Sequence, residues 1–491
     1  MEYFLNKAIR VLTVVKFTNI IISTMIELIE GINMRKPKVG FLSVTCPTHR
    51  EAKNEIGDNW VSTSNMEKIK SELTGSDLDL VVIDKVVAYF YELDEVEKRF
   101  NDENVDVIFI YISTWNWADQ VTQFIRNVRK PVILYAIDDS KAWSIGGLGA
   151  THGGLDEIGI KTRVAYGDIS DKDVIDKIVS YSKASMVRNI LRKSRYGSIG
   201  GQGMGILTGI VDANQWLKDF GILTGFTDQY TVVVEAEKFP VSEVKNYYEK
   251  LKNEYRSIPE FSKVFENSIR TYLALEKIIK EERYNFTGVK CTFDLSNNYC
   301  SACLAQSRLS NRGFVSACLN DSNGALSTYI LSLLKKKEEP VFTADVNLAN
   351  KKDNLIKLID DGAASPKLTL NPKEDAELLM QPTLEAKASG ICTKLFAKPG
   401  DVTLIRLARI DSKYVLHLTE GEAISVDSAK KESIMAECGY PIWPHALVRI
   451  KGNIDRFVDN LRSEYIHMTY GNLSSEIKDF CGLFDIELIE N

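Results

Sequence analysis

The chain has 491 residues, which at roughly 100–200 residues per domain corresponds to two to four domains. Hydrophobic residues make up 44% of the sequence and charged residues 26%, proportions that exclude wholesale disorder and a polytopic membrane protein. Because 61 Lys and Arg face 67 Asp and Glu, the net charge is −6, and the chain lacks the basic balance of a nucleic-acid-binding protein.

The first apolar stretch, residues 11–28, precedes the first predicted domain. A lysine interrupts it and no small-residue cleavage site follows, so it predicts neither a membrane span nor a signal peptide. A second methionine, Met34, stands directly before a strand-like run at 39–44. We interpret residues 1–33 as an extension outside the fold, of the kind that an upstream start codon would add. A peripheral membrane helix is the alternative.

Residues 34–195 alternate short β-rich runs with charged segments of helical period. The runs lie at 39–44, 79–83, 106–112, 131–137 and, more weakly, 162–166. Such a pattern predicts a parallel sheet covered by helices on both faces. Ligands bind such sheets at the carboxyl ends of their strands, and Trp115 follows the third run there.

A second α/β domain is predicted over residues 196–366. Its expected strands are 231–236, 287–294, 340–346 and 354–360, and its expected helices include 241–256, 263–283 and 324–336. The domain begins with the glycine-rich run 198–205, which lacks the Lys-Ser/Thr of a P-loop and does not complete GxGxxG. This run therefore predicts a tight reversal or a close backbone approach ahead of nucleotide binding.

The last region, 367–491, changes to a period of two. Runs at 403–410, 414–419 and 446–450 alternate apolar and polar residues between turns, which is typical of antiparallel strands. The predicted fold class is therefore α/β, with two doubly wound α/β domains (34–195 and 196–366) followed by a C-terminal antiparallel β-barrel-like domain.

The eight cysteines and five histidines exclude only a few kinds of catalytic or metal site. The one CxxC, Cys300 to Cys303, has no second pair at zinc-binding spacing, so free thiols in a reducing cytoplasm are expected. Protease, esterase, P-loop and kinase motifs are absent. A histidine and carboxylates at strand ends would suit a hard divalent cation that polarises a polyol or carbonyl, but spacing does not select which carboxylates would bind it.

Several runs, in the same order, resemble the L-fucose isomerase family, within a superfamily that includes the L-arabinose isomerases. They are 198–212, 317–326, 342–346, 356–362 and the end of the chain from His467 to Glu490. The resemblance implies a cytoplasmic homo-oligomer, a trimer or hexamer, that binds a small-molecule sugar and neither nucleic acid nor membrane. It also implies aldose–ketose isomerisation through an ene-diol with Mn²⁺ or another divalent cation.

Carried over residue by residue, the resemblance makes Asp345 the metal-binding acid–base aspartate and His467 a metal ligand. Trp115 matches a sugar-stacking tryptophan, and Met204 matches an apolar wall of the pocket. Trp443 is a further candidate for stacking on the sugar, although a structural turn would explain it equally well.

One position departs from the family. Leu319 stands where the family has a Glu that binds the metal and moves a proton, and leucine can do neither. Three nearby aspartates are candidates to restore a carboxylate: Asp361, which would also contact substrate, Asp360 and Asp321. The alternative is that they are caps and surface residues of a degenerate site. Two hypotheses follow: a metal-assisted isomerase weakened by Leu319, or an altered or inactive homologue that binds a sugar or supports an assembly.

Overall fold

The computed structural model describes residues 35–381 and 389–491. The predicted extension, residues 1–33, lies outside the described residues. Within these two ranges, no helix is both long and apolar enough to cross a membrane.

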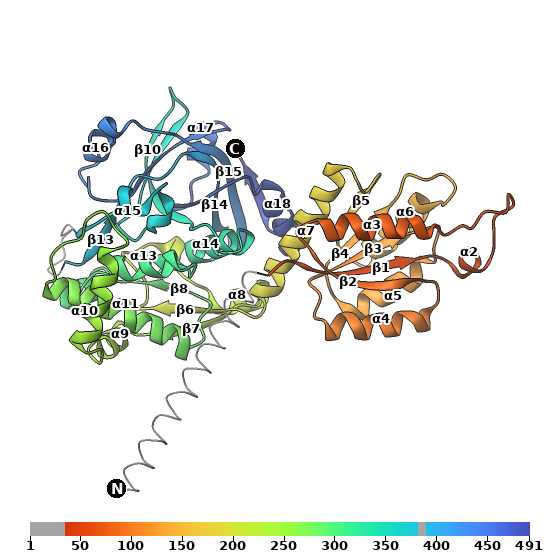
Figure 1. Cartoon of the computed structure of the whole chain (residues 1–491), viewed down its shortest axis with the longest axis horizontal. Helices are drawn as coiled ribbons and strands as arrows, with labels where there is room; N and C mark the ends of the chain where they lie inside the picture. The colour runs from red at the N-terminus through yellow and green to blue at the C-terminus, as the bar shows by residue number, and fades with distance from the viewer. Residues whose placement is uncertain (1–34, 382–388) are drawn as a thin grey trace, which may run out of the picture.

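The first domain is a five-stranded parallel sheet in the order β2-β1-β3-β4-β5, with helices on both faces (Figure 1). Its central strands are buried throughout, as their Val- and Ile-rich runs predict. The strands are β1 (Lys38–Val44), β2 (Asp79–Val87), β3 (Val107–Ile112), β4 (Val132–Ala136) and β5 (Thr162–Tyr166). The helices are α2 (Pro47–Glu51), α3 (Thr63–Gly75), α4 (Phe90–Asp102), α5 (Ala118–Val128) and α6 (Ser144–Glu157).

Helix α7 (Lys172–Leu191) carries the chain from the first domain into the rest of the molecule (Figure 1). Its first half packs into a core of the first domain through Val174, Ile178 and Tyr181. Its second half, including Val187 and Leu191, packs into a different core that belongs to the larger body. One continuous helix is therefore shared by two hydrophobic cores.

The second sheet is also parallel, with the order β7-β6-β8-β9. Its strands are β6 (Arg195–Ile199), β7 (Leu223–Thr227), β8 (Phe286–Val289) and β9 (Ser316–Cys318). Its helices are η1 (Leu207–Gly209), α8 (Ala213–Asp219), α9 (Gln229–Ala236), α10 (Val241–Lys252), α11 (Lys263–Glu281), α12 (Asp294–Asn298), α13 (Cys303–Asn311) and α14 (Ser322–Leu334). The strand expected at 231–236 is wrong: these residues lie in α9, which buries Val232 and Ala236, a spacing of one helical turn.

The third sheet has seven strands in the order β14-β17-β10-β11-β16-β15-β18, and β14 also pairs with β15, so the sheet closes into a ring. Its strands are β10 (Phe342–Asn350), β11 (Leu355–Ile359), β14 (Gly400–Ile410), β15 (Lys413–Ala423), β16 (His445–Ile450), β17 (Tyr465–Tyr470) and β18 (Glu487–Glu490). All its pairs are antiparallel except β15 with β18. The predicted fold class is confirmed, with a ring that is mixed rather than purely antiparallel.

Two strands belong to a different sheet from the one expected. The runs 340–346 and 354–360, assigned from sequence to the second α/β unit, form β10 and β11 of the ring. Short elements complete this region: η2 (Pro366–Leu368), α15 (Pro372–Asp375), the pair β12 (Glu377–Met380) and β13 (Ile391–Lys394), α16 (Ser428–Ala436), α17 (Ile454–Asp459) and α18 (Ser474–Phe484).

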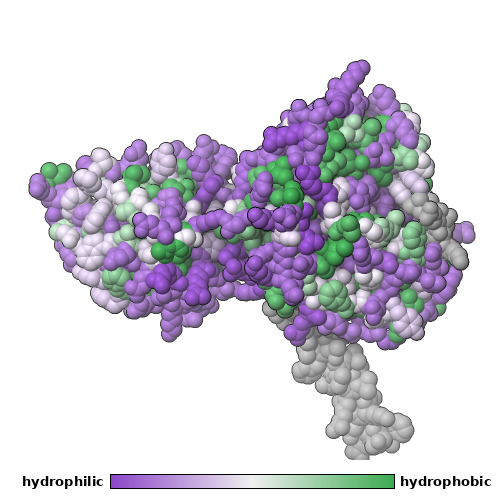
Figure 2. Space-filling model, turned by 180° about the vertical axis from the view of Figure 1, so that it is seen from behind, coloured by the Kyte–Doolittle hydropathy of each residue, from purple (hydrophilic) through white to green (hydrophobic). Residues whose placement is uncertain are grey.

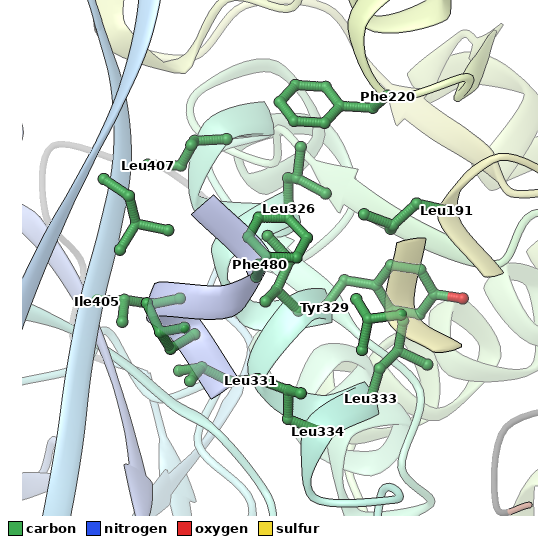
Figure 3. Packing of buried hydrophobic residues seen from close by; sticks show 14 of the residues in the cluster. Leu191, Phe220, Leu326, Tyr329, Leu331, Leu333, Leu334, Ile405, Leu407 and Phe480 are labelled. Carbon is green, nitrogen blue, oxygen red and sulfur yellow. The ribbon is translucent and has the colours of Figure 1, made fainter. Parts of the chain in front are cut away.

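Helix α14 lies at the centre of the larger body, and all of its residues are buried (Figure 3). Its Leu326 and Tyr329 belong to one core with Ile405 of β14 and Phe480 of α18. This core fixes the helix against the second sheet, the ring and α7 at once. The beginning of α14 is thus a rigid point at which side chains from several layers can meet.

The face seen in Figure 2 is mainly hydrophilic, with hydrophobic residues gathered in separate patches, most of them on the larger body. Among the exposed large hydrophobic side chains of that body are Leu207, Phe226 and Tyr230.

Candidate functional site

The predicted aspartates and His467 of the larger body lie on β10, directly after β11, on β17 and at the beginning of α14. Leu319 and Asn320 connect β9 to α14, and both adopt left-handed backbone angles, with φ of 50° and 54°. Non-glycine residues rarely adopt this conformation. Asn320 is held by Tyr196, whose hydroxyl donates to Oδ1 at 2.7 Å, and by its own donation to Ser198 Oγ at 2.8 Å. The backbone at Leu319, where the resemblance implies a Glu, is therefore tightly fixed.

The glycine-rich run covers this turn. A Cβ at Gly203 would lie 2.5 Å from the carbonyl oxygen of Leu319, and one at Gly209 would lie 3.2 Å from Cα of Asp321. Glycine is needed because the two backbones approach so closely. The predicted close backbone approach is what the structure shows. Met204, on the same run, is 58% exposed and free to contact a ligand.

Leu319 does not point into a polar site. It forms a small buried cluster with Cys318 and Tyr465, against which Ile206 packs. The Leu319 side chain is 7% exposed. At this position, where the family resemblance implies a charged ligand, the chain has a packed apolar contact.

Asp345 and Asp361 form the carboxylate pair of the site. Asp345 lies on β10 opposite Tyr465, and Asp361 follows β11. Burial, and next the charge of Asp361, raise the pKa of Asp345 to about 8. Burial, and next Glu464, raise the pKa of Asp361 to about 6. Both residues are partly exposed.

Asp360 has a different environment from its neighbour. Its Oδ1 accepts hydrogen bonds from the backbone N–H groups of Gly362, Ala363 and Ala364, at 2.7, 2.5 and 3.1 Å. Burial, and next Asp361, raise its pKa to about 7, although these three hydrogen bonds oppose the shift. Asp360 therefore stabilises the turn after β11, whereas the carboxylate of its neighbour Asp361 remains free to take part in chemistry.

His467 lies on β17, directly across from Thr343 of β10. Its Nδ1 lies 3.0 Å from Thr328 Oγ1 and 3.1 Å from Thr343 Oγ1. Its Nε2 lies 3.3 Å from Nη1 of Arg406. The imidazole is fully buried, and burial and the positive Arg406 lower its pKa well below the usual value.

Arg406 of β14 was not singled out from the sequence. Its guanidinium binds both carboxylate oxygens of Asp321: Nη1 donates to Oδ2, and Nη2 donates to Oδ1 at 3.0 Å. Both side chains are 2% exposed. Asp321 also caps α14 by accepting from the Gly324 N–H at 3.0 Å, and a Cβ at Gly324 would collide with the pair. Asp321 is therefore engaged, unlike Asp361.

A divalent cation does not fit these residues as they stand. Within the part of the chain that the structure describes, no three His, Cys, Asp or Glu side chains converge in a way that could hold a metal ion. Leu319 supplies no donor, Asp321 is neutralised by Arg406, and the Nε2 lone pair of His467 faces a guanidinium N–H. Asp345 and Asp361 remain as carboxylate donors, fewer than the number of oxygen ligands that a hard cation takes.

Trp443 packs beside the Asp361 turn. It is 6% exposed and stacks on Tyr440 with ring centroids 4.1 Å apart. Its Nε1 donates to Gln381 Oε1 at 3.2 Å, and Gln381 Nε2 donates to the Asp361 carbonyl at 2.8 Å. Trp443 therefore supports the turn that carries Asp361 more directly than it offers a face to a sugar.

Trp115 is not brought to the other site residues within the chain. It follows β3, and this strand lies on the other side of α7 from α14 and β10 (Figure 1). Its side chain is 43% exposed. Nearby, His49 Nδ1 lies 3.1 Å from Thr114 Oγ1, and its ring stacks on Trp60 at 4.2 Å.

The thiols lie behind the carboxylates. Cys300 and Cys303 are buried and free, and burial raises the pKa of both thiols. Cys303 Sγ donates to the Asp361 carbonyl at 3.4 Å, and Cys318 Sγ lies 4.0 Å from Asp361 Oδ2. A narrow cavity of about 40 Å³, lined by Thr328, Thr343 and Asp360 among others, runs behind the same residues.

Family models match both ends of the chain. The first N-terminal domain of L-fucose isomerase matches residues 37–193, and the C-terminal domain of L-fucose isomerase matches residues 373–490. The chain belongs to the L-fucose isomerase family.

Individual relatives are distant. The chain is 21% identical to a sulfoquinovose isomerase of Alkalicoccus urumqiensis over 66% of this chain and 71% of that protein. It is 19% identical to the sulfoquinovose isomerase of Priestia aryabhattai over 74% of this chain and 81% of that protein. An L-fucose isomerase of Citrobacter koseri matches at 23% identity over 37% of this chain and 33% of its own length. Identity at this level supports descent from aldose–ketose isomerases without fixing the substrate.

Proposed function

We propose that this chain catalyses aldose–ketose isomerisation of a sugar at the Asp345–Asp361 pair. The observation that carries the proposal is the pair itself: two interacting, accessible carboxylates whose pKa values of about 8 and about 6 lie on either side of neutrality. A pair of this kind holds one proton near pH 7, so one group is a base while the other is an acid.

In the proposed reaction, the ionised carboxylate of Asp361 removes the proton from C2 of the aldose. The protonated carboxyl of Asp345 gives its proton to the carbonyl oxygen O1, which produces the ene-diol. The new carboxylic acid of Asp361 then returns its proton to C1, and Asp345 takes the proton from O2 to leave the ketose. Both carboxyl groups regain their starting protonation, and no proton is lost or gained overall.

Asp361 in this scheme supplies the carboxylate that Leu319 removes. It is a neighbour of residue 319, because Cys318 Sγ lies 4.0 Å from its Oδ2. The sequence predicted Mn²⁺ bound weakly by Asp345 and His467, and the family reaction uses such an ion. The proposal assigns no step to it, since the donor set does not fit.

A second function is supported by the packing of Leu319 and by the Arg406–His467 contact. Both remove family ligands from the site while leaving a fold that could bind a sugar without turnover. The family also leads us to propose a homo-oligomer, a trimer or hexamer. In such an assembly, Trp115 of another copy would be a candidate to cover the sugar.

The test is a screen of aldoses, with L-fucose and sulfoquinovose included, for ketose formation with added Mn²⁺ and with chelator. Isomerisation that is lost in Asp345→Asn supports the proposal. Saturable binding of a sugar by calorimetry with no ketose from any of them would support the second function and reject the first.

A further inference from the structure

The two ring nitrogens of His467 contact different groups. Nδ1 is within hydrogen-bond distance of the hydroxyls of Thr328 and Thr343, at 3.0 and 3.1 Å. Nε2 lies 3.3 Å from Nη1 of Arg406. Arginine is always protonated and can only donate, so Nε2 accepts and Nδ1 carries the imidazole proton. This tautomer presents the sole nitrogen lone pair to the guanidinium.

The guanidinium is built into the fold. Arg406 lies on β14 where the pairing of this strand with β17 ends, at Ile405 opposite His467. It is bound by both oxygens of Asp321, which is fixed as the cap of α14. Glycine at position 324 leaves room for the pair, since a Cβ there would lie 2.8 Å from Nη1. Three elements thus hold one cation against His467.

We propose that the Arg406 guanidinium takes the place of a divalent metal ion beside His467, and that this chain handles its sugar without one. A metal bound to His467 would need the lone pair on Nε2 that Arg406 already occupies. Leu319 is consistent with a site that holds no metal ion, because an apolar contact has replaced the Glu that would complete a metal site. Arg406 acts as a positioning residue, since it is buried and contacts His467 rather than an open surface.

This inference deepens the proposed function and rests on it for the sugar chemistry alone. Metal binding is measured without turnover, so a protein that isomerises no sugar can still confirm the inference. Conversely, an active protein that binds a metal at His467 would refute it and leave the isomerase proposal standing.

The first measurement uses the full chain labelled with ¹⁵N-histidine, which gives signals from only five residues. His467 is assigned by its loss in His467→Gln. We expect the signal pattern of a neutral ring protonated at Nδ1, unbroadened when Mn²⁺ is added to 1 mM. Selective paramagnetic broadening of the His467 signals by stoichiometric Mn²⁺ would overturn the inference.

The second measurement asks whether metal binding can be restored. The triple variant Leu319→Glu, Asp321→Asn, Arg406→Met adds the family carboxylate and removes the cation together with its counter-charge, while Asn still caps α14. We expect Mn²⁺ affinity, from the signal of free Mn²⁺ in electron paramagnetic resonance, to rise at least about 10-fold over the wild type.

Arg409→Met is the matched control, because Arg409 lies on the same strand and donates to the Ile210 carbonyl instead. It should leave the Mn²⁺ affinity unchanged. A folded triple variant that binds Mn²⁺ no more tightly than the wild type would show that Arg406 is not what excludes the ion, and would overturn the assignment. If the triple variant does not fold, the histidine spectrum of the wild type decides alone.

Discussion

The two halves of the site, one around Asp345 and Asp361 and the other around His467, differ in how their charges are balanced. Around Asp345 and Asp361, carboxylates lie close together with few hydrogen bonds, and their pKa values are raised to about 8 and about 6. Around His467, every charge is matched: Arg406 binds Asp321 in a bidentate pair, and both are buried. In the proposed function, the carboxylate half is therefore the reactive one, while the arginine half is structural and fixes the geometry.

The largest expected effect comes from breaking the carboxylate half. Asp345→Asn removes the group that exchanges a proton with O1 and O2, so kcat should fall by about 10²–10⁴-fold with the fold intact. Steady-state kinetics and circular dichroism check this. The control is Asp84→Asn on β2, whose side chain is 75% exposed and which should retain full activity. Equal activity of the two variants would contradict the assignment of Asp345.

Breaking the arginine half should instead cost stability. Arg406→Met leaves the Asp321 carboxylate buried without its partner, and the free energy of unfolding should fall by about 3–5 kcal/mol. Urea unfolding measures this loss. Adding Asp321→Asn removes the stranded charge and should recover much of the stability. A single variant as stable as the wild type would mean that the pair does not fix the site.

The interaction within the carboxylate pair can be sharpened by pH. Activity should rise as Asp361 ionises near pH 6 and fall as Asp345 ionises near pH 8. The negative charge of Asp361 raises the pKa of Asp345, so Asp361→Asn should move the pKa of Asp345 to lower values. A ¹³C titration of the Asp345 carboxyl group would show this shift even in an inactive variant. An unchanged pKa would mean that the two groups do not interact.

The smallest effect is expected at the rim of the site. Met204 is 58% exposed, so Met204→Ala should change the unfolding free energy by less than about 0.5 kcal/mol. If Met204 forms a wall of the sugar pocket, KM should rise by a few fold while kcat stays constant. A matched loss of kcat would instead place Met204 among the groups that act in the transition state.

Sequence alone predicted the first parallel sheet well, because buried parallel strands appear as continuous apolar runs. In the second sheet it located the strand β8 but did not predict β6 or β7. It failed at 231–236, where Thr-Val-Val-Val-Glu-Ala has the composition of a strand but buries Val232 and Ala236 as a helix does. It also placed β10 and β11 in the wrong sheet. A strand pattern shows that a segment pairs, but not which neighbour it pairs with, and only the chain's path decides this.

Within the site, sequence indicated that Asp345, Asp361 and His467 belong together, and these residues lie on β10, after β11 and on β17, which adjoin in the ring. It could not separate Asp360 from Asp361, because the distinction is three backbone N–H groups that only the folded turn supplies. It missed Arg406, whose place in the alternating run 403–410 resembles an ordinary solvent-facing position. That Arg406 is buried becomes evident only when its strand is found to be buried on both faces.

Helix α7 carries a mechanical consequence. Its 20 residues span about 30 Å, and its two halves are anchored in different cores. The helix is therefore a rigid connection between the two domains, without an internal loop that would let them move independently. A small change in the tilt of α7 where Leu191 enters the central core would therefore displace the part of the first domain that carries Trp115 by a larger distance.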